Sequence, residues 1–354
     1  MPTLFGSTYS PDSLRRQTST IGQIAGIQLR EVADGKARGM RVAEVYTGSG
    51  LRFTVLLDRA LDIGAAEYGG TPLAWVHPAL GGPELYDAEG AGWVRTWGGG
   101  LVTTCGLTHF GQPEQDGPEA LGLHGRIAHT RGENIAITQE WQGDDYVLAV
   151  SGQARQVVMG GENLLLTRRI STRLGATSLL IEDTVRNEGL QPSPHMILYH
   201  CNFGFPVISP DSELLLGASS VRPRDAAAAA GLADYRHFAP PQDEYPEQVF
   251  FHTPPVEAGG WVRAALVNRA LGFGASLAYR AAELPCLGQW KMLAAGTYVC
   301  ALEPANYHET PRARLREEGR LRYLAPGEQV QYALEIGALP DAAAITAWEA
   351  GRAE

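Results

Sequence analysis

The sequence predicts an all-β fold, a sandwich of two packed sheets with a few short helices, and three observations support this. Apolar and polar residues alternate with a period of two over many short segments, as in strands with one buried face. The 42 glycines and 22 prolines provide the turns that a long series of strands requires. Helical periodicity is confined to two stretches. Two sheets packed face to face are the simplest arrangement for so many half-buried strands.

The expected strands follow one another along the chain, separated by short clusters of Gly, Pro, Asn or Asp. They cover residues 24–33, 41–46, 52–58, 134–141, 145–154, 164–173, 178–187, 195–204, 262–269, 297–304 and 331–339. Helices are expected over the Ala-rich residues 225–235 and over 341–351, where Asp341 is an N-cap candidate. No internal repeat or low-complexity linker divides the chain, so residues 1–354 are expected to form a single domain.

The 354-residue chain is acidic, with a formal net charge of −10. This charge argues against a nucleic-acid surface, which needs basic residues to neutralise phosphates, and against an anionic membrane surface. The tightest basic cluster is Arg312, Arg314 and Arg316, which alternate with apolar residues and precede two glutamates, so we expect a solvated loop or edge. A neutral, polyhydroxylated small molecule suits such a chain as a partner.

Cysteine usage and the N-terminal sequence both favour the cytoplasm. The four cysteines, Cys105, Cys201, Cys286 and Cys300, form no CxxC pair and are expected as buried free thiols in a reducing compartment. The N-terminus lacks the basic start and apolar run of a signal peptide. No segment approaches the ~20 apolar residues of a membrane span. We therefore expect a soluble, cytoplasmic protein.

Three histidines lie in informative contexts. His109 ends GGGLVTTCGLTHFG in the long, Gly- and Pro-rich section from 70 to 130, where Trp and His residues favour a functional loop. His124, in LGLHGRI, lies between glycines that let a ligand approach the backbone closely. His200 ends an apolar strand in ILYHCNFGFP. Each also fits a hydrogen-bonded polar residue at a loop or strand end. That interpretation is favoured for His109, and the two weigh equally for His124 and His200.

Glu303 lies in an apolar strand, TYVCALEPANY, directly before Pro304. A carboxylate there is either paired or has a pKa raised by desolvation, unless it turns to solvent at the end of the strand. A buried carboxylate near imidazoles is a standard route to a general base near neutral pH.

Four segments, taken in order, resemble the aldose 1-epimerases or galactose mutarotases, and especially their poorly characterised bacterial branch. They are GGGLVTTCGLTHFG at 98–111, LHG at 123–125, YHCNFGFP at 199–206 and ALEPANY at 301–307. The resemblance covers about residues 20 to 340. It implies a galactose mutarotase-like β-sandwich (supersandwich) and an isomerase of carbohydrate metabolism. This enzyme would interconvert the anomers of a free aldose with no cofactor and no metal.

The resemblance also implies roles for the matching residues. Glu303 would take the proton from the anomeric hydroxyl, and His200 would protonate the ring oxygen, so that the ring opens. An imidazole with its ordinary pKa of ~6.5 can supply a proton at neutral pH, whereas a carboxyl with a pKa of ~4.3 is already ionised. His124 would hydrogen-bond a sugar hydroxyl. His109 and Asn202, which lie in two of the segments, are counted with the sugar-binding residues.

Two features of the mutarotases are missing. An arginine usually precedes LHG, but GGGLVTTCGL contains none. Arg59 is our choice for this contact, although its two acidic neighbours equally fit a structural ion pair, and Arg95 and Arg126 are the alternatives. The aspartate that contacts sugar hydroxyls has no clear match, and Glu247 is the candidate. We therefore expect substrate recognition to differ from that of galactose mutarotase.

The segment GQWKML precedes the Glu303 strand and offers further candidates. Trp290 could stack on an apolar sugar face, Lys291 could bind an acidic or phosphorylated sugar, and Gln289 lies beside them. A core tryptophan next to a solvated lysine is the slightly favoured alternative.

Two other functions remain open at this stage. His109, His124, His200 and Glu303 could bind a divalent ion, which would support a metal-assisted epimerase or lyase acting on a keto-sugar, although no HxH or HExxH motif is present. The same fold could serve as a non-catalytic carbohydrate-binding module. No dinucleotide, P-loop or GxSxG signature is present, so no organic cofactor is expected. The oligomeric state is not predicted.

Overall fold

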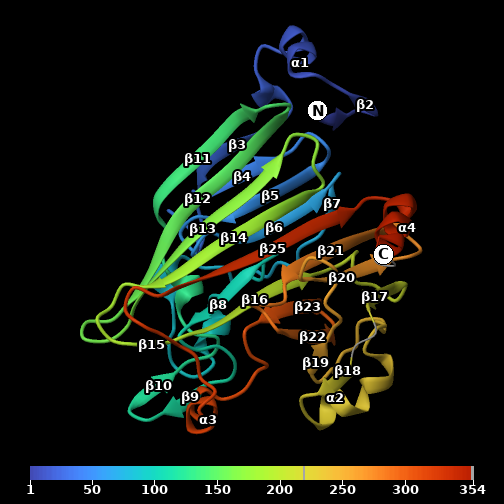
Figure 1. Ribbon diagram of the computed structural model, residues 1–354. Helices are drawn as coiled ribbons and strands as arrows, with labels where there is room; N and C mark the ends of the chain where they lie inside the picture. Colours follow the sequence, from blue (N-terminus) through green and yellow to red (C-terminus); the bar gives the residue numbers. More distant parts are fainter. Residues whose placement is uncertain (218–219, 352–354) are drawn as a thin grey trace.

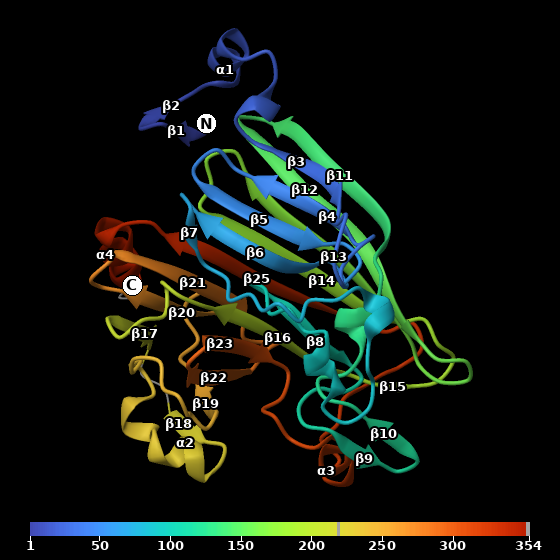
Figure 2. The same cartoon turned by 180° about the vertical axis from the view of Figure 1, so that it is seen from behind.

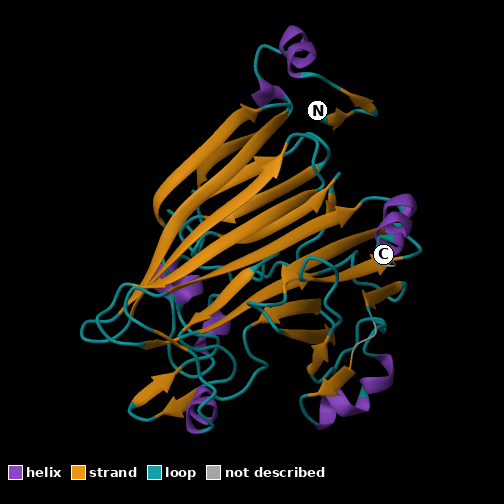
Figure 3. Ribbon diagram, in the orientation of Figure 1, coloured by secondary structure: helices purple, strands orange, loops and turns teal. Residues whose placement is uncertain are grey.

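The computed structural model describes residues 1–217 and 220–351, and most of its elements are strands (Figures 1 and 3). The largest sheet has the order β11-β12-β13-β14-β25-β21-β20-β17, with every neighbouring pair antiparallel. Its strands are β11 (Glu133–Gln142), β12 (Asp145–Val157), β13 (Asn163–Arg173), β14 (Ser178–Asn187), β25 (Gln329–Leu339), β21 (Phe273–Arg280), β20 (Trp261–Asn268) and β17 (Ser212–Leu216).

Two further sheets face this one. A five-stranded sheet contains β3 (Gly26–Glu31), β4 (Arg41–Tyr46), β5 (Leu51–Leu56), β6 (Asp62–Tyr68) and β7 (Thr71–Pro72). A six-stranded sheet has the order β18 (Ser220–Pro223), β19 (Gln248–Thr253), β22 (Cys286–Ala294), β23 (Thr297–Ala305), β16 (Met196–Phe203) and β8 (Thr103–Leu107). The bridges Ile63–Val102 and Ala74–Phe203 join the two.

The remaining elements are short. Three two-stranded ribbons pair β1 (Thr3–Leu4) with β2 (Ser7–Thr8), β9 (Glu114–Asp116) with β10 (Glu119–Leu121), and β15 (Ser193–Pro194) with β24 (Tyr323–Leu324). The α-helices are α1 (Pro11–Gln17), α2 (Ala226–Ala230), α3 (Arg312–Glu317) and α4 (Ala342–Ala350). Short 3₁₀ turns cover Ile21–Gln23, Pro83–Leu85, Gly92–Arg95, Ile127–His129 and Leu232–Asp234.

The hydrophobic core lies between the eight-stranded sheet and the two sheets that face it. Val55 of β5, Leu166 of β13 and Cys201 of β16 belong to one continuous buried cluster. This packing confirms the predicted all-β sandwich with few short helices. The expected strands and the C-terminal helix are present, and the Asp341 side chain accepts a hydrogen bond from the Ala344 N–H as the predicted N-cap.

One expectation is wrong. The cluster around Arg312 is helix α3, and Arg312 itself is only 3% exposed. Its guanidinium lies 2.7 Å from Asp116 and also pairs with Glu119, both on the β9–β10 ribbon. A buried guanidinium is retained where carboxylates surround it, and these partners lie almost 200 residues away in the sequence. The local alternation of charges could not reveal them.

A buried ionic network ties the eight-stranded sheet to the strands beneath the site. Arg168 of β13 lies 2.8 Å from Asp62 and 2.6 Å from Asp183. The Tyr199 hydroxyl on β16 donates to Asp183, and Arg168 also donates to Thr104 on β8. Because every charged member has a partner, the network holds β8 and β16 in place without leaving an unpaired buried charge.

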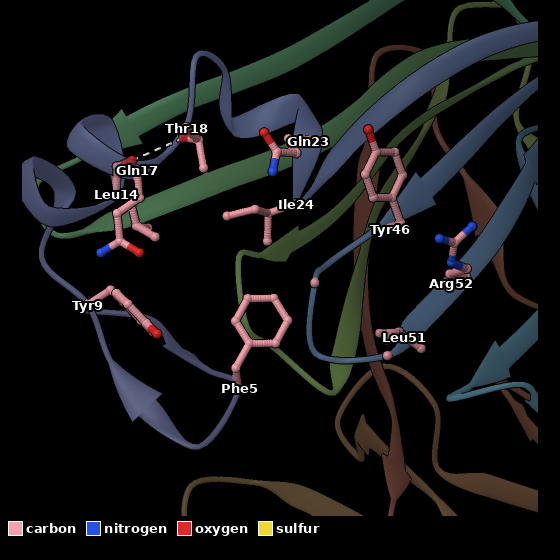
Figure 4. A pocket seen from close by; sticks show the side chains of 12 residues that line it. Phe5, Tyr9, Leu14, Gln17, Thr18, Gln23, Ile24, Tyr46, Leu51 and Arg52 are labelled. Atoms are coloured by element: carbon pink, nitrogen blue, oxygen red, sulfur yellow. Dashed lines mark hydrogen bonds between the residues drawn. The ribbon is translucent and has the colours of Figure 1, made fainter.

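The N-terminal arm, formed by β1, β2 and α1, extends from the end of the sandwich opposite the six-stranded sheet (Figures 1 and 2). The arm and the adjoining strands line a cavity of about 460 Å³. Phe5 and Tyr9 lie on the arm side of this cavity, and Ile24 and Leu51 lie on the sandwich side (Figure 4).

All four cysteines are free thiols, as predicted; three are buried and Cys286 is half-buried. Among the described residues, none of the helices is both long enough and apolar enough to cross a bilayer.

Candidate active site

A small cavity lies on the face of the six-stranded sheet that is turned away from the main core. Its volume is about 120 Å³. The lining combines aromatic residues with titratable ones: Trp93, Trp97, Phe110, His124, His200, Arg224, Glu247, Trp290, Glu303 and Glu309. This volume lies below the roughly 300–1,000 Å³ of sites for drug-sized ligands, so the cavity suits a single small ring.

His200 and Glu303 meet because of strand periodicity and register. On β16, Tyr199 and Cys201 point into the main core, so His200 points to the opposite face. The antiparallel pairs Leu198–Ala305 and Cys201–Leu302 set a register that places His200 across from Glu303. The His200 Nε2 lies 3.1 Å from the Glu303 Oε1. Both side chains are buried, and β23 continues through Pro304, so Glu303 does not turn out to solvent.

Gly288 lies on β22, the strand that flanks β23 on the side opposite β16, and it leaves room for the Glu303 carboxylate. Gly288 of β22 is the register partner of Glu303. A Cβ atom at position 288 would lie 2.8 Å from the Glu303 Oε2 and 3.2 Å from its Cβ. A glycine inside a strand weakens the strand and is typical of places where another group approaches the backbone closely. The absent side chain at 288 therefore helps to fix the carboxylate against His200.

Asn202 determines which nitrogen of His200 carries the proton. The Asn202 Nδ2 donates to the carbonyls of Gly100 and His200, both at 2.9 Å, so its Oδ1 must be the acceptor. That Oδ1 lies 2.6 Å from the His200 Nδ1. Neutral His200 therefore carries its proton on Nδ1, and the lone pair of Nε2 faces Glu303.

Burial moves the two pKa values in opposite directions. Burial raises the pKa of Glu303 to about 8; the nearby Glu309 and Glu247 raise it further, and Arg224 opposes them. Burial lowers the pKa of His200 to about 4, and the hydrogen bond that His200 donates to Asn202 opposes this shift. Between these values the pair holds one proton, which resides on Glu303 and is directed at the His200 Nε2.

His124 forms the neighbouring wall of the cavity. Its backbone is in the left-handed region at φ 57°, and its ring centroid lies 5.7 Å from that of His200 and 4.9 Å from that of Trp93. The Gly111 N–H donates to the His124 Nδ1 at 3.4 Å. Burial, together with His200 and His109, lowers the pKa of His124 well below its ordinary value. The neutral ring therefore carries its proton on Nε2, which has no partner among the described residues and can donate to a ligand.

Arg224, which the sequence did not single out, lines the same cavity. Arg224 lies between Glu247 at 2.6 Å and Glu309 at 3.3 Å, with Asp225 at 2.9 Å. The Trp290 Nε1–H donates to the second oxygen of Glu247 at 3.0 Å. Glu247 and Trp290 thus lie at the cavity, where the sequence placed them as candidates. Arg224 carried no local signal, because it follows the short edge strand β18 directly before the N-cap of α2.

Gln289 and Lys291 point away from the cavity. They flank Trp290 on β22, and successive side chains of a strand point to opposite faces. Gln289 bonds to His252 and to the Tyr235 carbonyl, and the Lys291 Nζ donates to the Asp234 carbonyl at 2.9 Å. The structure therefore separates these two residues from Trp290.

Arg59, His109 and Arg126 also lie outside the cavity lining. The buried Arg59 side chain donates to the Gly81 carbonyl and lies 3.1 Å from the His129 Nε2. Arg126 pairs with Glu162. His109 is buried, with its Nδ1 3.3 Å from Glu114. Burial and the charge of Arg312 lower the pKa of His109 to about 4.

Within residues 1–217 and 220–351, no group of three or more His, Cys, Asp or Glu side chains has the arrangement of a metal site. His200, His124 and Glu303 do share one cavity, where the His200 Nε2 contacts Glu303 at 3.1 Å and the His124 Nδ1 accepts from Gly111. The described side chains therefore present donors and acceptors for hydrogen bonds to a small molecule.

Comparison with known proteins agrees with this architecture. A family model described as "Domain of unknown function (DUF4432)" matches residues 37–338. Among curated proteins, none matches the chain significantly. The crystal structure of a "putative aldose 1-epimerase" from Klebsiella pneumoniae subsp. pneumoniae MGH 78578 superposes with a TM-score of 0.87 at 25% identity, over 92% of this chain and 86% of that chain.

Two more distant structures share the fold. A galactose mutarotase-like protein from Clostridium acetobutylicum gives a TM-score of 0.60 at 12% identity, over 90% of this chain and 99% of that one. The galactose 1-epimerase from Lactobacillus acidophilus NCFM gives 0.59 at 12% identity, with the same two coverages. The likenesses confirm the galactose mutarotase-like sandwich and the structural relatives that the sequence resemblance predicted.

Proposed function

The chain belongs to the family described as Domain of unknown function (DUF4432), and we propose that it is an isomerase that interconverts the anomers of a free aldose. The observation that carries the proposal is the contact of 3.1 Å between the His200 Nε2 and the Glu303 Oε1 in a cavity sized for one sugar ring. We propose that the whole chain acts as one carbohydrate-active unit. The fold shared with a galactose 1-epimerase supports the reaction class.

In the proposed reaction the two oxygens of the hemiacetal replace the direct contact between Glu303 and His200. The Glu303 carboxylate takes the proton from the anomeric hydroxyl, the bond between C1 and the ring oxygen breaks, and the ring oxygen takes the proton from the His200 Nε2. The open-chain aldehyde then rotates about its C1–C2 bond. In the reverse steps the Glu303 carboxyl protonates the carbonyl oxygen, and the His200 Nε2 takes the proton from the attacking hydroxyl.

This cycle needs one proton on the pair at every stage. Ring opening starts with the proton on His200 and ends with it on Glu303, which is also the arrangement that burial favours in the free protein. Ring closure gives the proton back to His200, and in the free protein the contact of 3.1 Å lets the proton pass between the two residues. Asn202 holds the His200 ring so that only Nε2 takes part.

The other cavity residues supply binding. The His124 Nε2–H would donate to a hydroxyl, and the Trp290 and Trp97 rings, whose centroids lie 5.5 and 5.2 Å from that of His200, would cover an apolar sugar face. Arg224 and Glu247 together offer donors and acceptors for further hydroxyls, so Arg224 would take the place of the arginine missing upstream of His124.

The test is anomer exchange measured by NMR on the purified protein across a panel of aldoses, ketoses and keto-sugars. At least one aldose should exchange its α and β signals faster than in buffer alone. If exchange of every sugar stays at the buffer rate, the proposal fails.

Gly288→Ala tests the positioning of the carboxylate. The added Cβ would lie 2.8 Å from the Glu303 Oε2 and displace it from His200. Misplacing a catalytic group by about 1 Å can cost on the order of 10²-fold, so we expect kcat to fall about 10- to 100-fold while the fold is retained. Gly337→Ala in β25 is the matched control, since it adds a Cβ inside a strand of the eight-stranded sheet, 3.1 Å from the Ser276 Oγ and 3.2 Å from the Ser178 Cβ, and touches no residue of the cavity. An unchanged kcat in Gly288→Ala would contradict the assigned geometry.

Arg224→Gln tests the binding role of this residue. Hydrogen bonds to charged groups contribute roughly 1.5–3 kcal/mol, so KM should rise about 10- to 100-fold. Because Arg224 lowers the pKa of Glu303, its removal should also shift the alkaline limb of the rate profile to higher pH. Arg269→Gln, which removes a surface arginine that also pairs with two glutamates, should change neither quantity. A KM that stays within twofold would exclude Arg224 from sugar binding.

A further inference from the structure

A second, larger pocket adjoins the catalytic cavity and shares Glu309 with it. Its volume is about 520 Å³, and it lies where β18, the segment after β23 and helix α3 come together. Both β18 and α3 lie at the end of the molecule remote from the N-terminal arm (Figures 1 and 2). Glu309 forms the partition between the two spaces, because it lines both.

The charge of this pocket is opposite to that of the chain. Arg222, Arg314 and Arg320 line it, and Glu309 is the one acidic residue of the lining. That carboxylate is already turned to Arg224 at 3.3 Å. A protein with a net charge of −10 therefore presents three guanidinium groups in one concavity, beside the proposed sugar site. Such a concentration of positive charge raises the local concentration of anions.

Arg222 is the arginine of this pocket whose hydrogen-bond donors are available to a ligand. In the described part of the chain it forms no ion pair, and its guanidinium lies 4.7 Å from the centroid of the Phe251 ring, which leaves its donors free. Arg314 and Arg320 both contact Glu318, which lies outside the pocket lining, so two guanidinium groups share one carboxylate.

Strand periodicity links Arg222 to the catalytic cavity. Arg222 and Arg224 are two residues apart across an extended segment and so leave the backbone on the same side. Arg224 enters the catalytic cavity, and Arg222 enters the pocket beyond Glu309.

His308 and Thr310 complete the donor set. The His308 Nδ1 is buried and has no hydrogen-bond partner among the described residues. Burial, together with the charge of Arg222, lowers the pKa of His308, so the ring is neutral near pH 7 and can donate from one nitrogen. The Thr310 hydroxyl forms no hydrogen bond within the described residues and also lines the pocket. Guanidinium, imidazole and hydroxyl donors are the usual partners of a phosphate or carboxylate.

We propose that this basic pocket binds an anionic group, a phosphate in the first place, on a sugar whose ring occupies the cavity of His200 and Glu303. The inference rests on the proposed function and narrows its substrate to a sugar that carries an acidic substituent away from the anomeric carbon. The catalytic cavity, at about 120 Å³, has room for the ring alone, so a substituent must extend out of it, and the adjoining pocket receives it.

Binding of inorganic phosphate tests the pocket without any reference to catalysis. Calorimetry or NMR titration of the full chain should give saturable phosphate binding, weakened at least tenfold in Arg222→Gln. Arg314→Gln should weaken it in the same direction and serves if Arg222→Gln does not fold. Arg52→Gln is the matched control, because Arg52 also lies over an aromatic ring, Tyr46, and forms no ion pair with any described residue. It should bind phosphate like the wild type.

The substrate class is tested by comparing kcat/KM for a neutral aldose, the same aldose carrying a terminal phosphate, and the corresponding uronic acid. The phosphate should be preferred over the neutral sugar about tenfold or more, and Arg222→Gln should reduce this ratio to near one. The uronic acid distinguishes a general anion site from one specific for phosphate.

The two proposals fail differently. Saturable phosphate binding that depends on Arg222, without exchange of any sugar, would overturn the proposed isomerase and leave the anion pocket standing. Turnover of a neutral aldose with no phosphate preference and no phosphate binding would overturn the anion pocket alone. Phosphate binding that is unchanged in both Arg222→Gln and Arg314→Gln would also overturn it.

Discussion

Glu303→Gln should abolish anomer exchange while leaving sugar binding largely intact. The amide has the shape of the carboxyl but can neither accept the anomeric proton nor return it. Acid–base groups of this kind contribute about 10²–10⁴-fold each, and we expect kcat to fall by at least 10³-fold because the partner His200 then has nothing with which to exchange its proton. NMR exchange measures kcat, and calorimetry with the same sugar measures binding.

The fold should tolerate this substitution. Burial raises the pKa of Glu303 to about 8, so the buried carboxyl is neutral near pH 7, and a neutral amide replaces it without an unpaired charge. Glu182→Gln, on an exposed strand position paired with Arg169, is the control for a simple loss of carboxylate. Loss of sugar affinity together with activity would indicate a structural role for Glu303. A wild type that binds sugar without exchanging it would point instead to a carbohydrate-binding module.

The sequence allowed most of the long strands to be predicted, including β16, which is buried at every position, but not β6, β8, β17, β19, β21 or β22. Strand β8 is buried at every position, and β19 is buried at all but its last residue, so neither shows the alternation that reveals a half-buried strand. The long section from 70 to 130 was therefore expected as a loop, whereas it contributes β8 to the sheet that carries the site.

The pairing of His200 with Glu303 could be anticipated because the local signals of both residues are strong. An ionisable residue inside an apolar strand needs a partner, and both His200 and Glu303 have this character. The role of Asn202 in selecting the tautomer required coordinates, because it depends on which atoms face Gly100 and His200. Gly288 carried a usable signal, since glycine inside an apolar strand indicates a close approach.

The position of Arg224 at the cavity could not be predicted from the sequence. Arg224 lies 100 residues after His124, and only the pairing of β18 with β19 brings it to the cavity. The sequence contains many other arginines in more suggestive contexts, such as Arg59 between two aspartates. The Arg59 guanidinium instead bonds to the Gly81 carbonyl and to His129, away from the cavity. Long-range placement of this kind cannot be recovered from spacing along one chain.

The rate of anomer exchange should follow a bell-shaped pH profile, because the pair works only with a single proton. Burial raises the pKa of Glu303 to about 8, so above this pH the last proton is lost and neither group can act as the acid. Burial lowers the pKa of His200 to about 4, so below this pH a second proton is gained and neither can act as the base. We therefore expect kcat/KM to be flat between about pH 4 and 8 and to fall about tenfold per unit outside this window.

The measurement is kcat/KM from NMR exchange at each pH, with the buffer-catalysed rate subtracted, since acid and base accelerate mutarotation without protein. Asn202→Leu sharpens the test. Without the Asn202 Oδ1 the proton of His200 is no longer held on Nδ1, so the acid limb should move to lower pH and kcat should drop, because that hydrogen bond raises the pKa of His200. A profile that kept rising through pH 9 would require a single base with no acid partner. Glu303 and His200 would then act separately, and the contact of 3.1 Å between them would serve structure alone.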